Sequence, residues 1–288
     1  SDDAVPDDAT LEEAVERANR GDVVGIVCNL VDMARETRER VDALVRSSGN
    51  RVSTDLFHAR FLLEDRFNIE SKILVKYGQK RTKGTGGILI GTQVLEQSLN
   101  LDYDWLVTQV CPIDALLQRL GREYRYLHLR RDGQGIPECV VISPKDDNFG
   151  THAFLYGNLG NKKPHNISLL WRTRALVETK KSITFPFDVR GWIDAVYADT
   201  FEGEPLASSD GHKKWLAHRD GEKFVADTMG KINEQFLDSD MVISKMTRNG
   251  SASFSFVLYT KTANGFKTLS GKEFSKWDLA HPEKSEMV

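Results

Sequence analysis

The stretch ILIGTQVLEQSLNLDYDWLVTQVCPIDALLQRLGREYR, residues 88–125, decides the predicted fold. It contains two short aliphatic runs, at residues 88–91 and 105–110, and then an amphipathic run from residue 113 to about residue 123. Short aliphatic runs are typical of strands that are buried on both faces, and an amphipathic run is typical of a helix that covers a sheet. The stretch therefore predicts two strands and a helix of one layered α/β unit.

The same alternation of strands and helices extends over the first half of the chain. We expect further strands at residues 23–28, 52–57 and 139–142, and further helices at residues 10–20, 29–45 and 62–77. Thr10 and Glu13 have the spacing of a capping box, so the first helix is expected to begin near Thr10. This order predicts an α/β domain at residues 1–145, built on a parallel sheet with helices on both faces.

The character of the sequence changes after Pro144. Residues 145–166 are polar and rich in glycine, which is typical of a linker or a surface excursion. Helical patterns follow at residues 168–180, 185–199 and 208–235, and alternation at residues 251–259 predicts a strand. We therefore expect a linker with accessory helices at residues 146–205, and a C-terminal accessory region with a short β element at residues 206–288.

The composition allows a large core and gives little reason to expect a membrane protein. The 288 residues are 40% hydrophobic and 28% charged, which is enough apolar side chain for one large domain or two smaller ones. The net charge of −3 gives no overall attraction to polyanions, so contact with nucleic acid would depend on a local basic surface. No apolar run approaches the roughly 18 residues of a membrane helix, so we expect a cytoplasmic protein.

The three cysteines are expected to be buried, reduced thiols. Cys28, Cys111 and Cys139 lie far apart in the sequence, and each lies beside aliphatic residues. A metal site needs ligands that cluster, and these cysteines do not cluster. We therefore predict that this chain binds no metal.

The run QRLGREYR, residues 118–125, carries the clearest chemical pattern. Arg122 and Arg125 are three residues apart at or just beyond a helix end, so their guanidinium groups share roughly one face. Two planar, permanently charged groups suit a phosphate, above all one on which negative charge builds during phosphoryl transfer. The alternative is a solvated basic helix end that interacts favourably with the helix dipole.

Two further polar segments follow predicted strands. GTQVLEQSLNLD, residues 91–102, comes after one aliphatic run, and FHARF, residues 57–61, ends another strand. In an open parallel sheet ligands bind at the carboxyl edge, where hydroxyls and amides suit a phosphate backbone or a ribose. We expect both segments and the arginine pair on the same side of the sheet.

Together these segments resemble motifs IV to VI of superfamily 2 helicases. TQVLEQSLNLDYD followed by QRLGREYR is most similar to the helicase and nuclease that the type I CRISPR surveillance complex recruits. The resemblance covers about residues 21–143 and, more weakly, residues 171–199. It implies a second RecA-like motor domain with accessory helices, belonging to an ATP-dependent DNA translocase and nuclease that degrades invading DNA.

The resemblance also implies which residues meet ATP. Gln118, Arg122 and Arg125 would contact the phosphates, with the two arginines acting as catalytic fingers. At Asn100 the family usually has an acidic residue. The Asn100 amide can still hydrogen-bond a ribose hydroxyl, so we count it with the ATP-binding residues.

For DNA, the resemblance implies contacts from two segments and movement from 3′ to 5′ along a single strand. The DNA-binding residues would be His58 and Arg60 on the DNA-facing side, with Thr92, Gln93 and Ser98 between the strand and the nucleotide. Single-stranded DNA and the type I CRISPR surveillance complex are therefore the expected partners.

The sequence has no GxxxxGK[ST] phosphate loop. Residues 84–87 are rich in glycine but are followed by aliphatic residues. Without that loop and an acidic magnesium-binding motif the nucleotide has no cradle, so we expect the chain alone not to hydrolyse ATP. ATP and Mg²⁺ would be shared with a first motor domain, which would lie with the nuclease domain on another segment or chain.

Two basic runs are candidates for local contact with nucleic acid. One is a loop with Lys80, Arg81 and Lys83, for which an ordinary solvated loop is the alternative, and the other holds Arg119, Arg122, Arg125, Arg130 and Arg131. Tyr103 and Trp105 could stack on bases. Their place at the start of a strand favours packing in the core.

Three functions remain open from the sequence alone. A part of a DNA translocase is favoured by the resemblance. A generic superfamily 2 RNA helicase is the second, and the Glu96-Gln97-Ser98 wording argues against it. The third is a non-catalytic binding or regulatory module derived from such a helicase, which Asn100 and the missing phosphate loop favour.

Overall fold

The computed structural model describes residues 5–49, 51–96, 99–131, 133–145 and 165–206, a few single residues up to 217, and the strand residues 259–262, 265–268 and 273–274. The chain divides into two compact units, residues 1–219 and residues 220–288. Each unit is described by itself.

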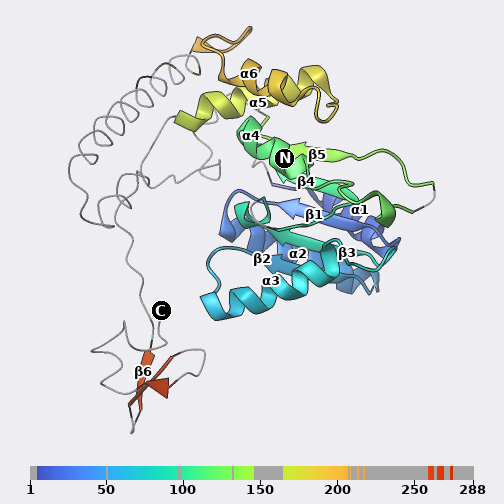
Figure 1. Ribbon diagram of the computed structural model, residues 1–288, viewed down its shortest axis with the longest axis vertical. Coiled ribbons are helices and arrows are strands. Elements are labelled where there is room, and N and C mark those ends of the chain that lie inside the picture. The colour runs from blue at the N-terminus through green and yellow to red at the C-terminus, as the bar shows by residue number, and fades with distance from the viewer. Residues whose placement is uncertain are drawn as a thin grey trace, which may run out of the picture. The chain divides into compact units, whose positions relative to one another are not determined.

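The first unit is built on a five-stranded sheet in the order β2-β3-β1-β4-β5 (Figure 1). The strands are β1 (Val23–Val27), β2 (Ser53–Phe57), β3 (Gly87–Gly91), β4 (Trp105–Gln109) and β5 (Cys139–Ile142). Every neighbouring pair is parallel. All five strands that the sequence predicts are therefore confirmed, and each observed strand begins and ends within one residue of its predicted bounds.

Six α-helices lie in the described residues of this unit. They are α1 (Asp8–Asn19), α2 (Val31–Ser48), α3 (Leu63–Tyr77), α4 (Ile113–Leu120), α5 (His165–Lys180) and α6 (Val189–Tyr197), together with the short 3-10 helices η1 (Gln93–Leu95) and η2 (Leu127–Leu129). The alternation of strands and helices that the sequence predicts for residues 1–145 is confirmed.

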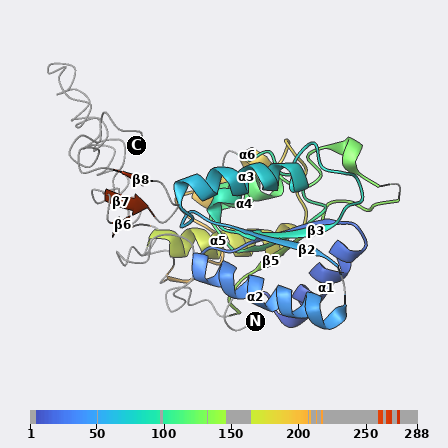
Figure 2. The same ribbon diagram turned by 90° about the horizontal axis from the view of Figure 1, so that it is seen from below.

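Alternate strand residues pack against helices on opposite faces of the sheet, which Figure 2 shows edge-on. Val24, Ile26 and their neighbours on that face form one core with α1 and α2. Val23, Val27 and their neighbours form a second core with α3. This is why the strands read as continuous aliphatic runs, because both faces are covered.

Several predicted helix ends differ from the observed ones, and two of these differences have a clear physical reason. Helix α1 begins at Asp8, because the Asp7 carboxylate accepts the Thr10 amide hydrogen bond at 2.9 Å and so caps the helix three residues before the predicted cap at Thr10. Helix α4 ends at Leu120 rather than near Glu123. The backbone of Glu123 is instead paired with Tyr103 in an isolated parallel bridge.

The accessory helices α5 and α6 pack on α4 through one apolar cluster, whose members include Leu116, Leu169 and Trp192. The predicted domain boundaries near residues 145 and 205 stay predictions. In the second unit β6 (Tyr259–Thr262), β7 (Gly265–Thr268) and β8 (Glu273–Phe274) form a small antiparallel sheet. The helix predicted at residues 208–235 and the strand predicted at residues 251–259 lie almost wholly outside the described residues.

Tyr103 and Trp105 are both 1% exposed, so their predicted packing in the core is confirmed and base stacking by these two rings is excluded. Tyr103 packs against the middle of β1 at Gly25. A Cβ atom at residue 25 would lie 2.9 Å from the Tyr103 ring.

We therefore expect Gly25→Ala to destabilise the first unit by about 1–3 kcal/mol, because the added methyl group overpacks the core against a buried ring. Midpoints of urea unfolding would measure this. Gly191→Ala in α6 is the control, because no atom lies within 4 Å of a Cβ built there and alanine favours a helix by about 0.5–1 kcal/mol. Equal midpoints for Gly25→Ala and the parent chain would contradict the packing.

Candidate nucleotide and nucleic-acid site

The ends of three neighbouring strands are joined at the carboxyl edge of the sheet. These strands are β2, β3 and β1, and β3 lies between the other two. We call the turn after β3, residues 92–96, the carboxyl-edge turn. Its Thr92 amide donates to the Phe57 carbonyl at the end of β2, 3.3 Å away. The Gln93 side-chain amide donates to the carbonyl of Asn29, just after β1, at 2.8 Å. Two of the segments that the sequence predicts to share an edge, residues 57–61 and 91–102, therefore meet there at their starts.

Arg119 of α4 is the buried cation of this edge. Its side chain is 1% exposed, and its Nε donates to Glu96 Oε1 at 2.7 Å. The same guanidinium group donates to the Thr108 hydroxyl, the Gln109 carbonyl and the Asn29 side-chain oxygen. Burial raises the pKa of Glu96, and the charge of Arg119 opposes that rise. Arg119 is thus a structural residue, and its assignment to a basic nucleic-acid surface is wrong.

Residues 121–126, which we call the arginine turn, follow α4. The Arg122 carbonyl accepts the Tyr103 amide at 2.8 Å, and the Tyr124 amide donates to the Tyr103 carbonyl at 3.0 Å. Tyr103 precedes β4, so the arginine turn lies at the amino end of that strand. The expectation that all three motifs lie at one edge is therefore wrong for this turn, because α4 runs back along the sheet from the carboxyl edge.

Arg122 reaches from this turn to the other motif. Its Nη2 donates to the Glu96 carbonyl, the last residue of the carboxyl-edge turn, at 2.7 Å. Its Nε is buried without a hydrogen-bond partner. Burial and the charge of Arg125 lower the pKa of Arg122. The guanidinium group is therefore partly desolvated, and two of the three motifs meet through it.

Arg125 is exposed, with its guanidinium carbon 6.0 Å from the centre of the Tyr126 ring. The Tyr126 amide donates to Asp102 Oδ1 at 2.9 Å, so Arg125 lies close to the segment that also carries Asn100. Asn100 and Gln118 are exposed as well. The structure shows no contact of either side chain with the two arginines.

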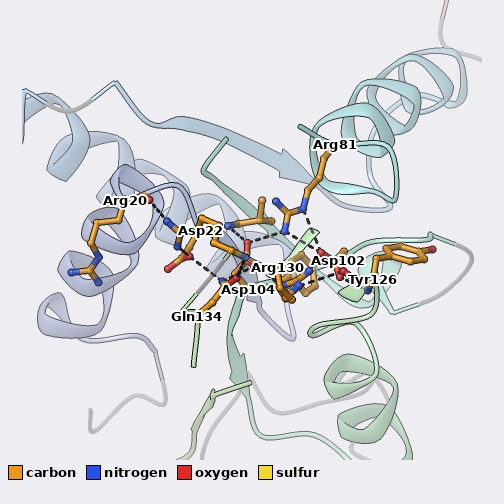
Figure 3. A network of polar contacts seen from close by, with 11 residues as sticks. Arg20, Asp22, Arg81, Asp102, Asp104, Tyr126, Arg130 and Gln134 are labelled. Carbon is orange, nitrogen blue, oxygen red and sulfur yellow. Dashed lines mark hydrogen bonds and ion pairs between the residues drawn. The ribbon is translucent and has the colours of Figure 1, made fainter. Parts of the chain in front are cut away.

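The other arginines after α4 are paired with carboxylates at the amino edge of the sheet (Figure 3). Arg130 contacts Asp102 and Asp104, and Arg131 contacts Asp22. Arg81 of the second basic run is 4% exposed and contacts Asp102 at 3.0 Å and Asp104 at 2.9 Å. Sequence reasoning missed this cluster and read its arginines as a surface for nucleic acid. Arg81 is therefore no part of a solvated loop.

The DNA-binding residues predicted from the resemblance lie at the carboxyl edge, with the exception of Ser98, which is outside the described residues. His58 is 3% exposed and stacks on Phe61 with ring centres 4.2 Å apart. Burial and the charges of Arg35 and Arg60 lower its pKa, so the imidazole is neutral at pH 7. Arg60 is 65% exposed at its side chain and contacts Asp32 at 3.2 Å. Arg60 is thus the charged member of the set.

Glu123 lies in the arginine turn, directly after Arg122 in the sequence. It lines a cavity of about 870 Å³ that Leu116, Val141 and Trp192 also line. Its Oε1 is buried without a hydrogen-bond partner. Burial raises the pKa of the carboxyl to about 8. No pattern in the sequence assigned a role to this residue.

Comparison with known proteins finds relatives along nearly the whole chain. A family model described as CRISPR-associated nuclease/helicase Cas3, C-terminal, matches residues 20–128. The CRISPR-associated endonuclease/helicase Cas3 of Escherichia coli (strain K12) is 35% identical over 291 residues, which are 99% of this chain and 31% of that protein. The chain therefore spans about a third of the length of this relative.

Solved structures share the fold. The crystal structure described as T. fusca Cas3-ATP is 26% identical, with a TM-score of 0.63 over 74% of this chain and 24% of that chain. A chain of the structure described as CRISPR RNA-guided surveillance complex, pre-nicking, is 28% identical, with a TM-score of 0.55 over 69% of this chain and 24% of that chain. The predicted RecA-like α/β fold class is confirmed.

The described residues show neither a membrane-spanning helix nor a cluster of metal ligands. No helix in them is long and apolar enough to cross a membrane. Within the same residues, no group of three histidine, cysteine, aspartate or glutamate side chains is placed to hold a metal ion.

Replacing Arg119 by methionine should destabilise the fold by about 3–5 kcal/mol, because the buried Glu96 carboxylate loses its charge partner. The double variant Arg119→Met, Glu96→Leu should recover part of that loss, because no unpaired charge is left. Urea unfolding of both variants measures the difference. Arg46→Ala, at an exposed position near the end of α2, should change stability by about 0.5 kcal/mol or less. If the double variant were as unstable as the sum of the two single losses of unfolding free energy, the pairing of Arg119 with Glu96 would be contradicted.

Glu123 should make the stability of the fold fall as pH rises from 4.5 to about 8. Its folded-state pKa lies above the ordinary value of 4.5, so between these limits the folded state keeps a proton that the unfolded state has lost. Below pH 4.5 the contribution of Glu123 to the stability is fully present. Glu123→Gln should remove this fall, and the midpoint of urea unfolding measured across the range tests it. A parallel fall in the variant would assign the pH dependence to other groups.

Proposed function

We propose that this chain is the helicase portion of an ATP-dependent translocase of single-stranded DNA. It is 35% identical along 99% of its length to a CRISPR-associated endonuclease/helicase, and a family model of the C-terminal part of such proteins matches residues 20–128. In this proposal residues 1–145 are the second motor domain. Residues 146–205 are its linker and accessory helices, and residues 206–288 are a further accessory region.

The observation that carries the proposal is the pairing of the arginines. Of the five arginines between residues 118 and 131, Arg119, Arg130 and Arg131 contact carboxylates. Among the described residues, Arg122 and Arg125 contact none: Arg122 donates to a carbonyl, and Arg125 is exposed. These are the two that the resemblance assigns as fingers. A guanidinium group without a counter-ion is ready to bind a phosphate.

The chemistry of phosphoryl transfer explains why such groups matter. Negative charge grows on the γ-phosphate oxygens and the leaving oxygen in the transition state, and fixed positive charge stabilises it. The partly desolvated guanidinium of Arg122 interacts more strongly with such charge than a fully solvated group would. The Glu96 carbonyl holds Arg122 in place without neutralising it. Gln118 and Asn100, both exposed, would donate and accept hydrogen bonds at the phosphates and the ribose.

ATP would bind between this domain and a first motor domain that supplies the phosphate loop. The T. fusca Cas3-ATP structure, which covers 74% of this chain, supports ATP as the nucleotide. Mg²⁺ would be held by that other domain together with the phosphates, because the described residues of this chain offer no cluster of acidic ligands for it. The chain alone should therefore not hydrolyse ATP.

Single-stranded DNA would lie along the carboxyl edge. Arg60 would contact a phosphate, and Thr92 and Gln93 would place hydroxyl and amide groups beside the backbone. His58, neutral and packed on Phe61, would shape this edge rather than add charge. Gln93 also donates to the Asn29 carbonyl, and Arg122 donates to the Glu96 carbonyl. The DNA strand would therefore contact the Gln93 end of the carboxyl-edge turn, and Arg122, which would contact the nucleotide, is bound to the Glu96 end.

The same correspondence supports a role in CRISPR interference in the cytoplasm. The similar chain in the structure described as CRISPR RNA-guided surveillance complex, pre-nicking, supports such a complex as the partner that brings this helicase to invading DNA, and the type I class is taken from the resemblance. A nuclease domain elsewhere would cut the strand that the motor moves, with 3′-to-5′ polarity taken from the resemblance.

The two finger arginines should be required for ATP hydrolysis. We would place residues 1–288 in the Escherichia coli relative in exchange for the matching part and measure ATP hydrolysis with and without single-stranded DNA. Arg122→Ala and Arg125→Ala should each lower kcat by about 10³-fold or more, the range of an arginine finger. Arg46→Ala should leave kcat unchanged.

Three results would separate the alternatives. Activity that depends on the fingers and on DNA supports the translocase. Stimulation by single-stranded RNA in place of DNA would support an RNA helicase. A folded chimera that binds DNA but hydrolyses no ATP would support the non-catalytic binding module and contradict the proposal.

A further inference from the structure

Two buried carboxylates lie on either side of Tyr103 at the amino edge of the sheet. Asp102 is 0% exposed and Asp104 is 5% exposed. Both contact Arg81 and Arg130 (Figure 3). Four charged groups with little access to water must be paired with one another, because an unpaired charge there would be very costly.

The two carboxylates differ in the backbone amide that each accepts. Asp104 Oδ2 accepts the amide of Val23, the first residue of β1, at 2.8 Å. Asp102 Oδ1 accepts the amide of Tyr126, the residue directly after Arg125, at 2.9 Å. Asp104 therefore holds the sheet, whereas Asp102 holds the end of the arginine turn.

Asp102 completes the fixation of that turn. Before Arg125, the Tyr124 amide donates to the Tyr103 carbonyl at 3.0 Å. After Arg125, the Tyr126 amide donates to Asp102. The backbone of Arg125 thus lies between two hydrogen bonds to the adjacent residues Asp102 and Tyr103. Without the second bond, only the first would fix the direction in which Arg125 leaves the turn.

Arg130 covers the same turn from the other side. Its guanidinium carbon lies 4.4 Å from the centre of the Tyr124 ring, and its Nη1 donates to the Tyr103 carbonyl at 3.3 Å. Tyr124 has a positive φ of 46°, a strained conformation that neighbouring contacts must maintain. Asp102 and Asp104 both pair with Arg130, so the direct hydrogen bond to the Tyr126 amide is the contact with the turn that Asp102 alone of the two makes.

We propose that Asp102 is a positioning residue for the finger Arg125, which it holds in its catalytic direction through the Tyr126 amide. This inference rests on the proposed function of Arg125 and adds a residue to it. Asp104 is the matched control, because it is buried, pairs with the same two arginines and accepts one amide, but that amide belongs to β1.

The geometric part can be tested on residues 1–288 by amide hydrogen exchange. Asp102→Ala should speed exchange at Tyr126 at least tenfold and leave Val23 nearly unchanged, and Asp104→Ala should do the reverse. Asp102→Glu, which keeps the charge but moves the carboxylate by one methylene group, serves as the second variant if the alanine variant does not fold. Equal exchange at Tyr126 in the parent chain and in a folded Asp102 variant would overturn the inference.

The catalytic part can be tested by a double-mutant cycle in the chimera. Asp102→Ala should lower kcat by about 10²-fold, a typical cost of a misplaced catalytic group, with KM for ATP much less affected. In the Arg125→Ala background Asp102→Ala should cost nothing more, whereas Asp104→Ala should have the same small effect in both backgrounds. Losses that multiply for Asp102 and Arg125 would overturn the positioning role. An Arg125→Ala variant with full activity would instead overturn the proposed function.

Discussion

A buried guanidinium group must be paired, and this requirement arranges the second half of the α/β unit. Arg119 is satisfied by Glu96 and by oxygen atoms at the ends of β1 and β4, and Arg81 and Arg130 are satisfied by Asp102 and Asp104. Arg122 and Arg125, by contrast, contact no carboxylate among the described residues. The pairing thus separates structural arginines from those that are free to bind a phosphate.

The carboxyl-edge turn and the arginine turn lie at opposite edges of the sheet, and the Arg122 side chain connects them. The carboxyl-edge turn follows β3, and the arginine turn lies beside the amino end of β4. They meet because α4 is only 8 residues long and the Arg122 side chain extends to the Glu96 carbonyl. In the proposed function, a change at the DNA-facing end of the carboxyl-edge turn would therefore alter the position of Arg122. This short path would then be a physical basis for coupling strand contact to hydrolysis.

Much of the fold could be predicted from the sequence, and little of the pairing could. Runs such as residues 23–28 predict strands because both faces of the sheet are covered, so burial leaves a local signal. The Asp7 cap was missed because Thr10 and Glu13 offered a competing capping pattern. The partners of the arginines leave no local signal, because Arg131 and Asp22 are 109 residues apart and the strand order brings them together. The resemblance proposed Arg122 and Arg125 as the fingers but could not show which neighbouring arginines are structural.

The most direct test of this account is a structure of the chimera with ADP, aluminium fluoride and single-stranded DNA, which imitates the transition state of ATP hydrolysis. The account predicts that guanidinium nitrogens of Arg122 and Arg125 lie within about 3.2 Å of the fluoride or phosphate acceptors. Arg119 and Arg130 should keep their carboxylate partners. A structure in which either of these two leaves its carboxylate to meet the nucleotide, while Arg122 stays on the Glu96 carbonyl and Arg125 stays in solvent, would contradict it.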